Sequence, residues 1–195
     1  ACAVDDAFEI AAVVKRQAEA VGVFVNAELD SVARIADLVG LTMIQLHGEE
    51  GPDYCSEVAR RTGCSVIKAA RVKSPADVRD LKRYRTSYHL LDAYVPGTAG
   101  GTGEKFNWDF AREDRGAAPV ILAGGLTPAN VAEAIGIAHP FAVDTASGVE
   151  ALPGVKDHDA MRAFAEAVRE LDPEPIPESE RQPQMPPDHV EADFR

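Results

Sequence analysis

Cysteine is scarce in this sequence, which has three cysteines among 195 residues. Cys2, Cys55 and Cys64 are odd in number and show no CxxC spacing, which argues against a disulfide framework and against a zinc site. No positively charged leader precedes an apolar segment, and no apolar run approaches the length of a membrane span. These absences predict a protein of the reducing cytoplasm that has no contact with membranes.

Basic residues are fewer than acidic ones. The sequence has 20 lysines and arginines and 32 aspartates and glutamates, which gives a net charge of −12. Such a charge opposes binding to nucleic acids and to anionic membrane surfaces, since phosphate backbones are bound by clustered Lys and Arg. Any phosphate that the protein binds is therefore expected to be small and locally held. The five histidines include no HExxH or similar ligand spacing, so no metal site is predicted.

Short apolar runs alternate with helical patterns along most of the chain. The hydrophobic content of 46% and the charged content of 27% are those of an ordinary globular protein. The predicted strands are 21–25, 43–46, 66–70, 88–91, 120–123 and 141–143, and the predicted helices are 5–20, 29–39, 53–62, 75–84, 128–137 and 158–171. Strands that alternate with helices over short connections predict a parallel α/β sheet.

The composition changes sharply after Leu171. Residues 172–195 contain six prolines and seven acidic residues against two arginines. Such a segment buries too little apolar surface to offset the entropy lost on ordering. We expect one domain over residues 3–171 and a disordered acidic tail or linker over 172–195.

Functional side chains recur where the predicted strands end. Because the carboxyl ends of parallel strands share one rim of the sheet, where ligands bind, these residues are expected to lie together. They are Asn26, His47, Gly48, Arg71, Asp92, Gly124, Gly125, Asp144, Ser147 and Gly148. Taken singly, Asp92 is either a catalytic acid or a turn residue. His47 likewise either binds a ligand or satisfies local backbone groups.

The last two predicted strands are followed by segments that are typical of a phosphate-binding site. LAGGLTP (122–128) places paired glycines after a strand, with Thr127 as a possible cap of the next helix, and DTASGVE (144–150) opens a short helix. N–H groups at helix starts favour anions, and in β/α barrels the loops after the last two strands commonly bind phosphate. The alternative is that Gly124 and Gly125 only form a tight turn.

Taken together, these motifs closely resemble the phosphoribosylanthranilate isomerase family. The matching segments are GVFVN (22–26), QLHG (45–48), IKAARV (67–72), LLDAYVPG with GGTG and FNW (90–108), ILAGGLTPANV (121–131) and VDTASGVE with PGVKD (143–157). The resemblance implies a (β/α)8 TIM barrel. It also implies a cofactor-free Amadori rearrangement of N-(5-phosphoribosyl)anthranilate, a step of tryptophan biosynthesis.

The resemblance also assigns roles to single residues. Asp92 matches the general acid that protonates the furanose ring oxygen, which requires a raised pKa. His47 matches a residue at the anthranilate end of the pocket, and Gln45 and Arg71 are taken as further substrate-binding residues. The residues assigned to phosphate binding are Gly124, Gly125, Asp144, Ala146, Ser147 and Gly148. Ala146 replaces a frequent Ser, and Asn107 a frequent Asp.

The family also begins with a strand, a helix and a second strand that have no counterpart here. That segment carries a K-I-C-G motif, whose Cys is the general base, and an Arg that receives the anthranilate carboxylate. Cys2 lacks this motif and is a poor substitute. We therefore expect a fragment with about six of eight strands and little activity, either monomeric or homodimeric. A fusion to another tryptophan-pathway domain after Arg195 is a further alternative.

Two alternatives remain open from the sequence. One is a non-catalytic phosphate-binding or assembly module without a general base. The other is a related phosphosugar barrel enzyme, such as an epimerase or an indole-glycerol-phosphate synthase, which would need different acid and base residues at the strand ends.

Overall fold

The computed structural model describes residues 2–14, 17–93, 108–113 and 116–171 of the chain. Residues 94–107, which contain the GGTG motif and Asn107, and the predicted tail at 172–195 lie outside the described residues. In the described ranges no helix combines the length and the apolar character needed to cross a bilayer.

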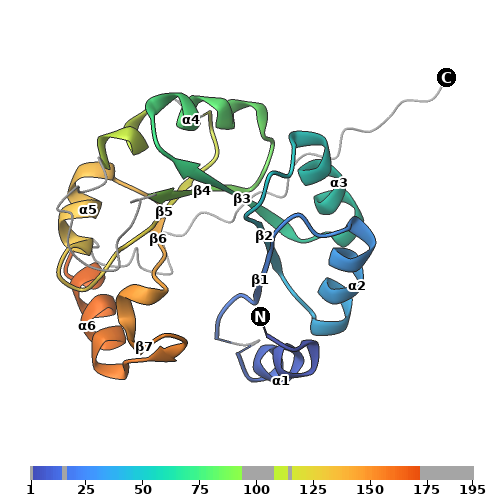
Figure 1. The fold of residues 1–195 in the computed structure, drawn as a ribbon, viewed down its shortest axis with the longest axis horizontal. Coiled ribbons are helices and arrows are strands. Elements are labelled where there is room, and N and C mark those ends of the chain that lie inside the picture. Colours follow the sequence, from blue (N-terminus) through green and yellow to red (C-terminus); the bar gives the residue numbers. More distant parts are fainter. Residues whose placement is uncertain (1, 15–16, 94–107, 114–115, 172–195) are drawn as a thin grey trace, which may run out of the picture.

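Six parallel strands form the main sheet, and each strand pairs with the next strand along the chain. The strands are β1 (Val21–Phe24), β2 (Met43–Leu46), β3 (Ser65–Val72), β4 (Tyr88–Ala93), β5 (Val120–Ala123) and β6 (Ala142–Val143). Figure 1 shows that the sheet curves and that helices line its outer side. Most residues of these strands are apolar, as expected for a parallel sheet that has side chains packed on its inner face and helices on its outer face.

The connecting helices account for the outer layer. They are α1 (Val4–Val14), α2 (Leu29–Val39), α3 (Pro52–Thr62), α4 (Pro75–Asp80), α5 (Val131–Ala138) and α6 (His158–Arg169). Gly40 and Gly63 end α2 and α3 at φ 71° and 69°, a left-handed conformation that glycine adopts without strain. Asp157 begins α6 by accepting hydrogen bonds from the N–H groups of Asp159 and Ala160.

The hydrophobic core lies on both faces of the curved sheet. Ile67, Ala69, Leu90 and Ala123 form a buried cluster on the inner face. Two larger clusters lie between the strands and the helices, one around α2 and α3 and one around α4, α5 and α6. The inner side chains of consecutive strands are therefore stacked in layers below the carboxyl rim.

Several boundaries differ from those predicted from the sequence. α1 ends at Val14, six residues earlier than expected, and the predicted helix at 75–84 is α4 followed by the 3-10 turn η1 (Leu81–Arg83). β3 and β4 extend to Val72 and Ala93, so that Arg71 and Asp92 lie within strands and not behind them. The sequence prediction also missed the 3-10 turn η2 (Trp108–Arg112) and the hairpin of β7 (Glu150–Leu152) and β8 (Val155–Lys156).

The ring of strands is open between β1 and β6 (Figure 1), which are the edges of the six-stranded sheet. Apolar side chains are exposed at both edges. Val23 in β1 is 59% exposed, and Phe141, directly before β6, is 67% exposed. In the described part of the chain the sheet therefore forms an incomplete barrel.

Candidate active site at the carboxyl rim

The inner face of the sheet brings four predicted site residues together. Gln45 and His47 are two residues apart at the end of β2 and point to the same side, as alternation along a strand requires. Arg71 and Asp92 are partners in the register of β3 and β4, and Asp92 is also the partner of Ala123 in the inner cluster. The register therefore directs Arg71 and Asp92 to the inner face.

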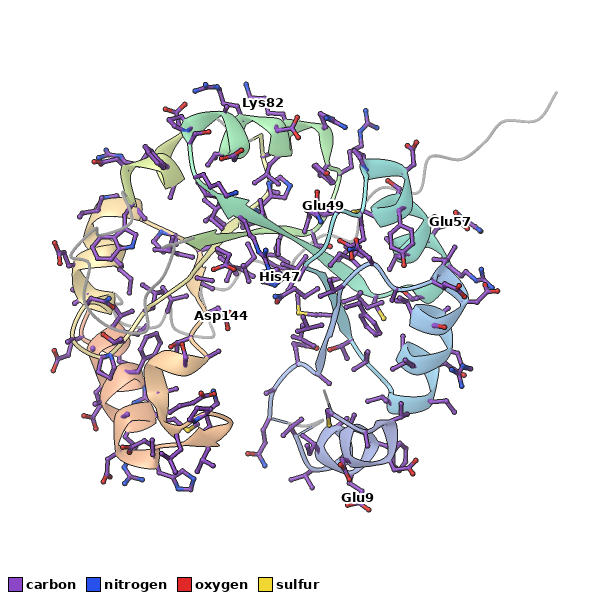
Figure 2. All side chains as sticks on the ribbon, viewed as in Figure 1. Glu9, His47, Glu49, Glu57, Lys82 and Asp144 are labelled. Carbon is purple, nitrogen blue, oxygen red and sulfur yellow. The ribbon has the colours of Figure 1, made fainter. Side chains whose placement is uncertain are left out.

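The central contact of the rim joins His47 and Asp92, which are 45 residues apart in the sequence. His47 Nε2 lies 3.2 Å from Asp92 Oδ2, and the two side chains are 22% and 29% exposed. On the other side of the ring, the side-chain nitrogen of Gln45 lies 3.0 Å from His47 Nδ1. Figure 2 shows His47 on the concave side of the sheet, on the same side as Asp144.

The Gln45 amide decides the direction of these hydrogen bonds. When its nitrogen faces the ring, the amide donates to Nδ1, and a neutral His47 carries its proton on Nε2 and donates it to an ionised Asp92. When the amide is reversed, its oxygen accepts from Nδ1–H, and Nε2 accepts the proton of a protonated Asp92. The second arrangement is the one in which Asp92 holds a proton that it can give to a substrate.

Asp144 follows β6, where its N–H donates to the Leu122 carbonyl over 2.8 Å. Burial raises the pKa of the Asp144 carboxyl above its ordinary value, and the charge of Asp92 raises it further, against the opposing effects of His47 and Lys156. A raised pKa favours the neutral carboxyl, which can donate a hydrogen bond to an anion. This behaviour is compatible with the phosphate-binding role predicted for Asp144.

The raised pKa predicts how Asp144 affects stability. Because the folded protein binds this proton more tightly than the unfolded chain, the free energy of unfolding falls as pH rises from the unfolded pKa to the folded pKa. Asp144→Asn is therefore expected to stabilise the protein at pH 7 and to have no such effect at pH 3, where both states are protonated. Urea unfolding of both proteins at the two pH values measures this. An equal increase in the free energy of unfolding at pH 3 would contradict a raised pKa of Asp144.

The two predicted phosphate loops lie against each other. The Leu126 carbonyl in the first loop accepts a hydrogen bond from Thr145 Oγ1 in the second over 2.7 Å. Gly148 approaches the same carbonyl so closely that a Cβ built on it would lie 1.8 Å from the oxygen. Gly124 and Gly125 adopt φ values of 86° and 66°, which side chains disfavour. Glycine is therefore required at position 148 by the close contact and is favoured at positions 124 and 125 by the backbone conformation.

Neighbouring side chains fix both loops. Asn130, the N-cap residue of α5, accepts from the Thr127 N–H over 2.8 Å and donates to the Gly125 carbonyl over 3.1 Å. Capping by Thr127, as predicted from the sequence, is therefore wrong. Lys156 donates to the Ala146 carbonyl over 2.6 Å, which ties the second loop to the β7–β8 hairpin. The predicted short helix after β6 is the 3-10 turn η3 (Ser147–Val149).

A cleft of about 730 Å³ opens at the rim over the ends of β1, β2 and β3, a size that suits a small organic ligand. His47, Arg71, Lys73 and Tyr84 are among its lining residues, so that the cleft adjoins the His47–Asp92 contact. In the described residues, no group of three or more His, Cys, Asp or Glu side chains has a geometry that would hold a metal ion.

Comparisons with known proteins agree on one family. The family described as N-(5'phosphoribosyl)anthranilate (PRA) isomerase matches residues 3–167 of the chain. N-(5'-phosphoribosyl)anthranilate isomerase of Geobacter sp. (strain M21) is 49% identical over 153 residues, which cover 78% of this chain and 73% of that protein.

Two solved structures are similar along most of their length. Phosphoribosyl anthranilate isomerase of Thermotoga maritima has a TM-score of 0.78 and 40% identity, covering 87% of this chain and 82% of that chain. A phosphoribosyl anthranilate isomerase in complex with reduced 1-(o-carboxyphenylamino)-1-deoxyribulose 5-phosphate has a TM-score of 0.73 and 36% identity, covering 87% of this chain and 81% of that chain.

Proposed function

The chain belongs to the phosphoribosylanthranilate isomerase family, and we propose that the rim around His47 and Asp92 is its active site. It is an isomerase of tryptophan biosynthesis, and its six parallel strands form part of a (β/α)8 barrel. The observation that best supports this site is the contact of 3.2 Å between His47 and Asp92, beside the two loops that follow β5 and β6.

The acid step follows from the position of Asp92. A protonated Asp92 gives its proton to the furanose ring oxygen, the bond between that oxygen and C1′ breaks, and the anthranilate nitrogen forms a Schiff base with C1′. A general base then removes the proton from C2′, and the resulting enol tautomerises to the ketose. The substrate N-(5-phosphoribosyl)anthranilate is thus converted into 1-(2-carboxyphenylamino)-1-deoxyribulose 5-phosphate without gain or loss of atoms.

The two Gly-containing loops are proposed to bind the substrate phosphate. Backbone N–H groups of Gly124, Gly125, Ser147 and Gly148 are suitable donors to phosphate oxygens, because donors on a fixed backbone need no reordering on binding. Asp144, whose pKa is raised mainly by burial, is a further donor when its carboxyl is protonated. The reduced 5-phosphate compound bound by the relative described above is a suitable probe of this site.

Arg71 and Gln45 are proposed to contact the rest of the substrate. Arg71 lines the rim cleft next to His47, where its guanidinium can donate hydrogen bonds to the substrate. Gln45 acts through the hydrogen bond to His47 Nδ1, which fixes the orientation of the imidazole. Both residues are thus proposed to orient the substrate and the acid.

The general base is proposed to be a cysteine outside these 195 residues, on a segment that pairs with the open edges of the sheet. The unpaired edges at β1 and β6 and their exposed apolar side chains support this proposal. Cys2 lines a different groove, formed by α1 and β1, and is not among the described residues that line the rim cleft. Residues 1–195 alone are therefore expected to have little activity.

Complementation of a tryptophan auxotroph that lacks the isomerase tests both proposals. The natural gene in full is expected to restore growth, whereas residues 1–195 alone are not. Failure of the full gene, in the presence of detectable folded protein, would contradict the function. Strong growth from residues 1–195 alone would leave the function intact but would contradict the proposal of an external base.

A cytoplasmic location is proposed on the basis of cysteine chemistry. Cys2, Cys55 and Cys64 are all free thiols, as expected in a reducing compartment. Burial raises the pKa of the Cys55 thiol to about 11, which keeps it protonated and unreactive. Its role is packing between α3 and the sheet.

A further inference from the structure

Glu50 and Lys68 form a buried ion pair that the proposed chemistry does not use. Lys68 Nζ lies 2.9 Å from Glu50 Oε2, and the two side chains are 5% and 3% exposed. Lys68 is in the middle of β3, and Glu50 is in the loop between β2 and α3. Lys68 Nζ also lies 5.9 Å from the centre of the Tyr84 ring. The charges are thus enclosed directly behind the rim that carries His47.

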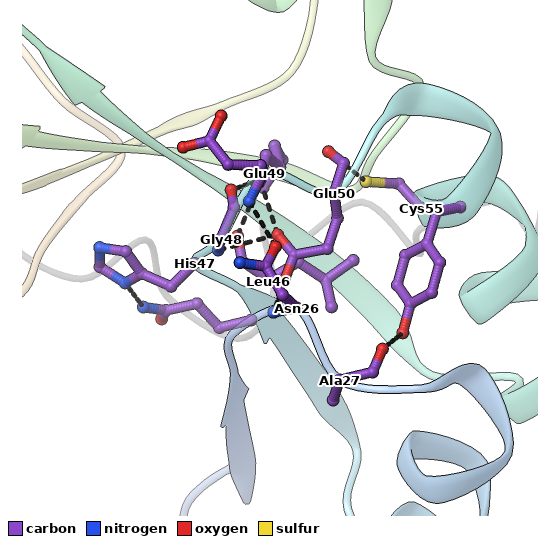
Figure 3. Close-up of polar contacts among 11 residues, drawn as sticks. Asn26, Ala27, Leu46, His47, Gly48, Glu49, Glu50 and Cys55 are labelled. Carbon is purple, nitrogen blue, oxygen red and sulfur yellow. Dashed lines mark hydrogen bonds and ion pairs between the residues drawn. The ribbon is translucent and has the colours of Figure 1, made fainter.

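The ion pair holds the backbone on both sides of Gly48. Glu50 Oε2 accepts a hydrogen bond from the Gly48 N–H over 2.8 Å, and Lys68 Nζ donates to the Gly48 carbonyl over 2.6 Å. Lys68 Nζ also lies 3.4 Å from the Leu46 carbonyl oxygen. Figure 3 shows these contacts converging on the segment from Leu46 to Glu50. His47 is the residue between Leu46 and Gly48, the two residues whose carbonyl oxygens Lys68 contacts.

Asn26 fixes the same segment to the end of β1. Its N–H donates to Glu50 Oε1 over 2.7 Å, and its side-chain oxygen accepts from the Glu49 N–H over 2.7 Å. A Cβ built on Gly48 would lie 2.4 Å from this oxygen, so that the loop approaches Asn26 as closely as glycine allows. Asn26 itself has φ 50°, a left-handed conformation rare outside glycine. The ends of β1 and β2 and the middle of β3 are thus joined through one polar network.

Packing alone does not explain the presence of these charges. Removing two charges from water is costly, and apolar residues of similar size commonly stabilise a core as well or better. Burial by itself would raise the pKa of the Glu50 carboxyl, but the hydrogen bonds from Lys68 and Asn26 outweigh it and lower that pKa. What the charged pair supplies, and an apolar pair would not, is directional hydrogen bonding to the backbone that carries His47.

We propose that Glu50 and Lys68 are positioning residues for the reaction: they fix the backbone on both sides of His47 so that its imidazole meets Asp92. The pair acts through His47 and does not touch the substrate. This inference rests on the proposed role of Asp92, but the geometric part of it can be tested without any turnover.

A double-mutant cycle with His47 tests the kinetic part in the full-length natural protein. Glu50→Gln with Lys68→Met removes both charges together, so that neither is left buried alone. We expect this pair of changes to lower kcat by about 10- to 100-fold with little change in KM, because misplacing an acid by about 1 Å has effects of this size. In a His47→Asn background the same changes should lower kcat by less than about twofold, since coupled residues are not additive. Equal losses in both backgrounds would overturn the inference.

The matched control removes an ion pair of the same kind from the surface. Arg61 and Asp30 pair over 2.6 Å between α3 and α2 and are exposed. Arg61→Met with Asp30→Asn is expected to leave kcat unchanged, because exposed pairs contribute little and this one joins two outer helices. A loss of kcat as large as that from the buried pair would show a general effect of charge removal and would overturn the inference.

A spectroscopic measurement on the substrate-free protein separates this inference from the proposed function. The ¹⁵N chemical shifts of the His47 imidazole should respond to Asp92→Asn when Glu50 and Lys68 are intact, and should not respond in the double variant. Lys68→Arg, which keeps the charge and the donors, should retain the response. If the double variant does not fold, Glu50→Asp replaces it, with a weakened response expected. A full response without the ion pair overturns the inference, whatever the isomerase assay shows.

Discussion

Replacing Asp92 by Asn in the full-length natural protein is expected to lower kcat by about 10²- to 10⁴-fold, the usual contribution of a general acid. The amide keeps the size of the side chain and can still contact His47 Nε2, but it has no proton of suitable acidity for the ring oxygen. Because the substrate remains bound by the rest of the rim, KM should change little. Steady-state kinetics with N-(5-phosphoribosyl)anthranilate measures both quantities.

An aspartate outside the His47–Asp92 contact provides the control. Asp80, the last residue of α4, lines the cleft that His47 also lines, but its side chain is exposed and pairs with Arg83 over 3.1 Å. Asp80→Asn changes the local charge equally and is expected to leave kcat within about twofold, as an exposed pair contributes little. If Asp92→Asn retained more than a tenth of the activity, or if both variants lost it equally, Asp92 would not be the general acid.

Replacing Gly148 by Ala is expected to lower the stability of the protein and to weaken its binding of the substrate phosphate. The added Cβ would lie 1.8 Å from the Leu126 carbonyl oxygen, which also accepts the hydrogen bond of Thr145. The Leu126 carbonyl belongs to the backbone and cannot adopt another rotamer, so the two phosphate loops must move apart. We expect a loss of about 3 kcal/mol in the free energy of unfolding, at the upper end for overpacking. We also expect KM to rise by at least roughly tenfold, the equivalent of about 1.4 kcal/mol of binding.

Gly136, in the helix that follows β5, offers a matched Gly→Ala control. It lies inside α5, and an added Cβ meets nothing within 4 Å. Ala is the better helix former, so Gly136→Ala should stabilise the protein by about 0.5–1 kcal/mol without a change in KM. Urea unfolding and steady-state kinetics distinguish the two variants. An unchanged KM for Gly148→Ala would contradict the placement of the phosphate in these loops.

Much of the fold was predictable because its signals are local. β-branched and apolar runs such as VGVFV and VILA favour strands, and each became part of the sheet at or near its predicted position, although Val23 in β1 is exposed at the open edge. Once the strands are parallel and ordered along the chain, the residues at their carboxyl ends must share one rim. That is why His47, Arg71 and Asp92 were placed together from the sequence.

The parts that were not predictable depend on pairing across the fold. β4 includes Asp92 because Arg71 and Ala123 pair with it from both sides, and nothing in the local sequence reports that register. The contact between His47 and Asp92 joins residues 45 positions apart. Lys68 within IKAA is the one signal that was available, since a charge in a covered strand requires a buried partner. The identity of that partner, Glu50, follows only from the structure.

The most direct test of the central claim is a crystal structure of the full-length natural protein with reduced 1-(o-carboxyphenylamino)-1-deoxyribulose 5-phosphate, the compound bound by its relative. The phosphate is expected on the backbone N–H groups of Gly124, Gly125 and Gly148, with Asp92 within hydrogen-bonding distance of the sugar oxygens. A ligand whose phosphate lies elsewhere, or whose sugar does not reach Asp92, would contradict the claim that this rim is the active site.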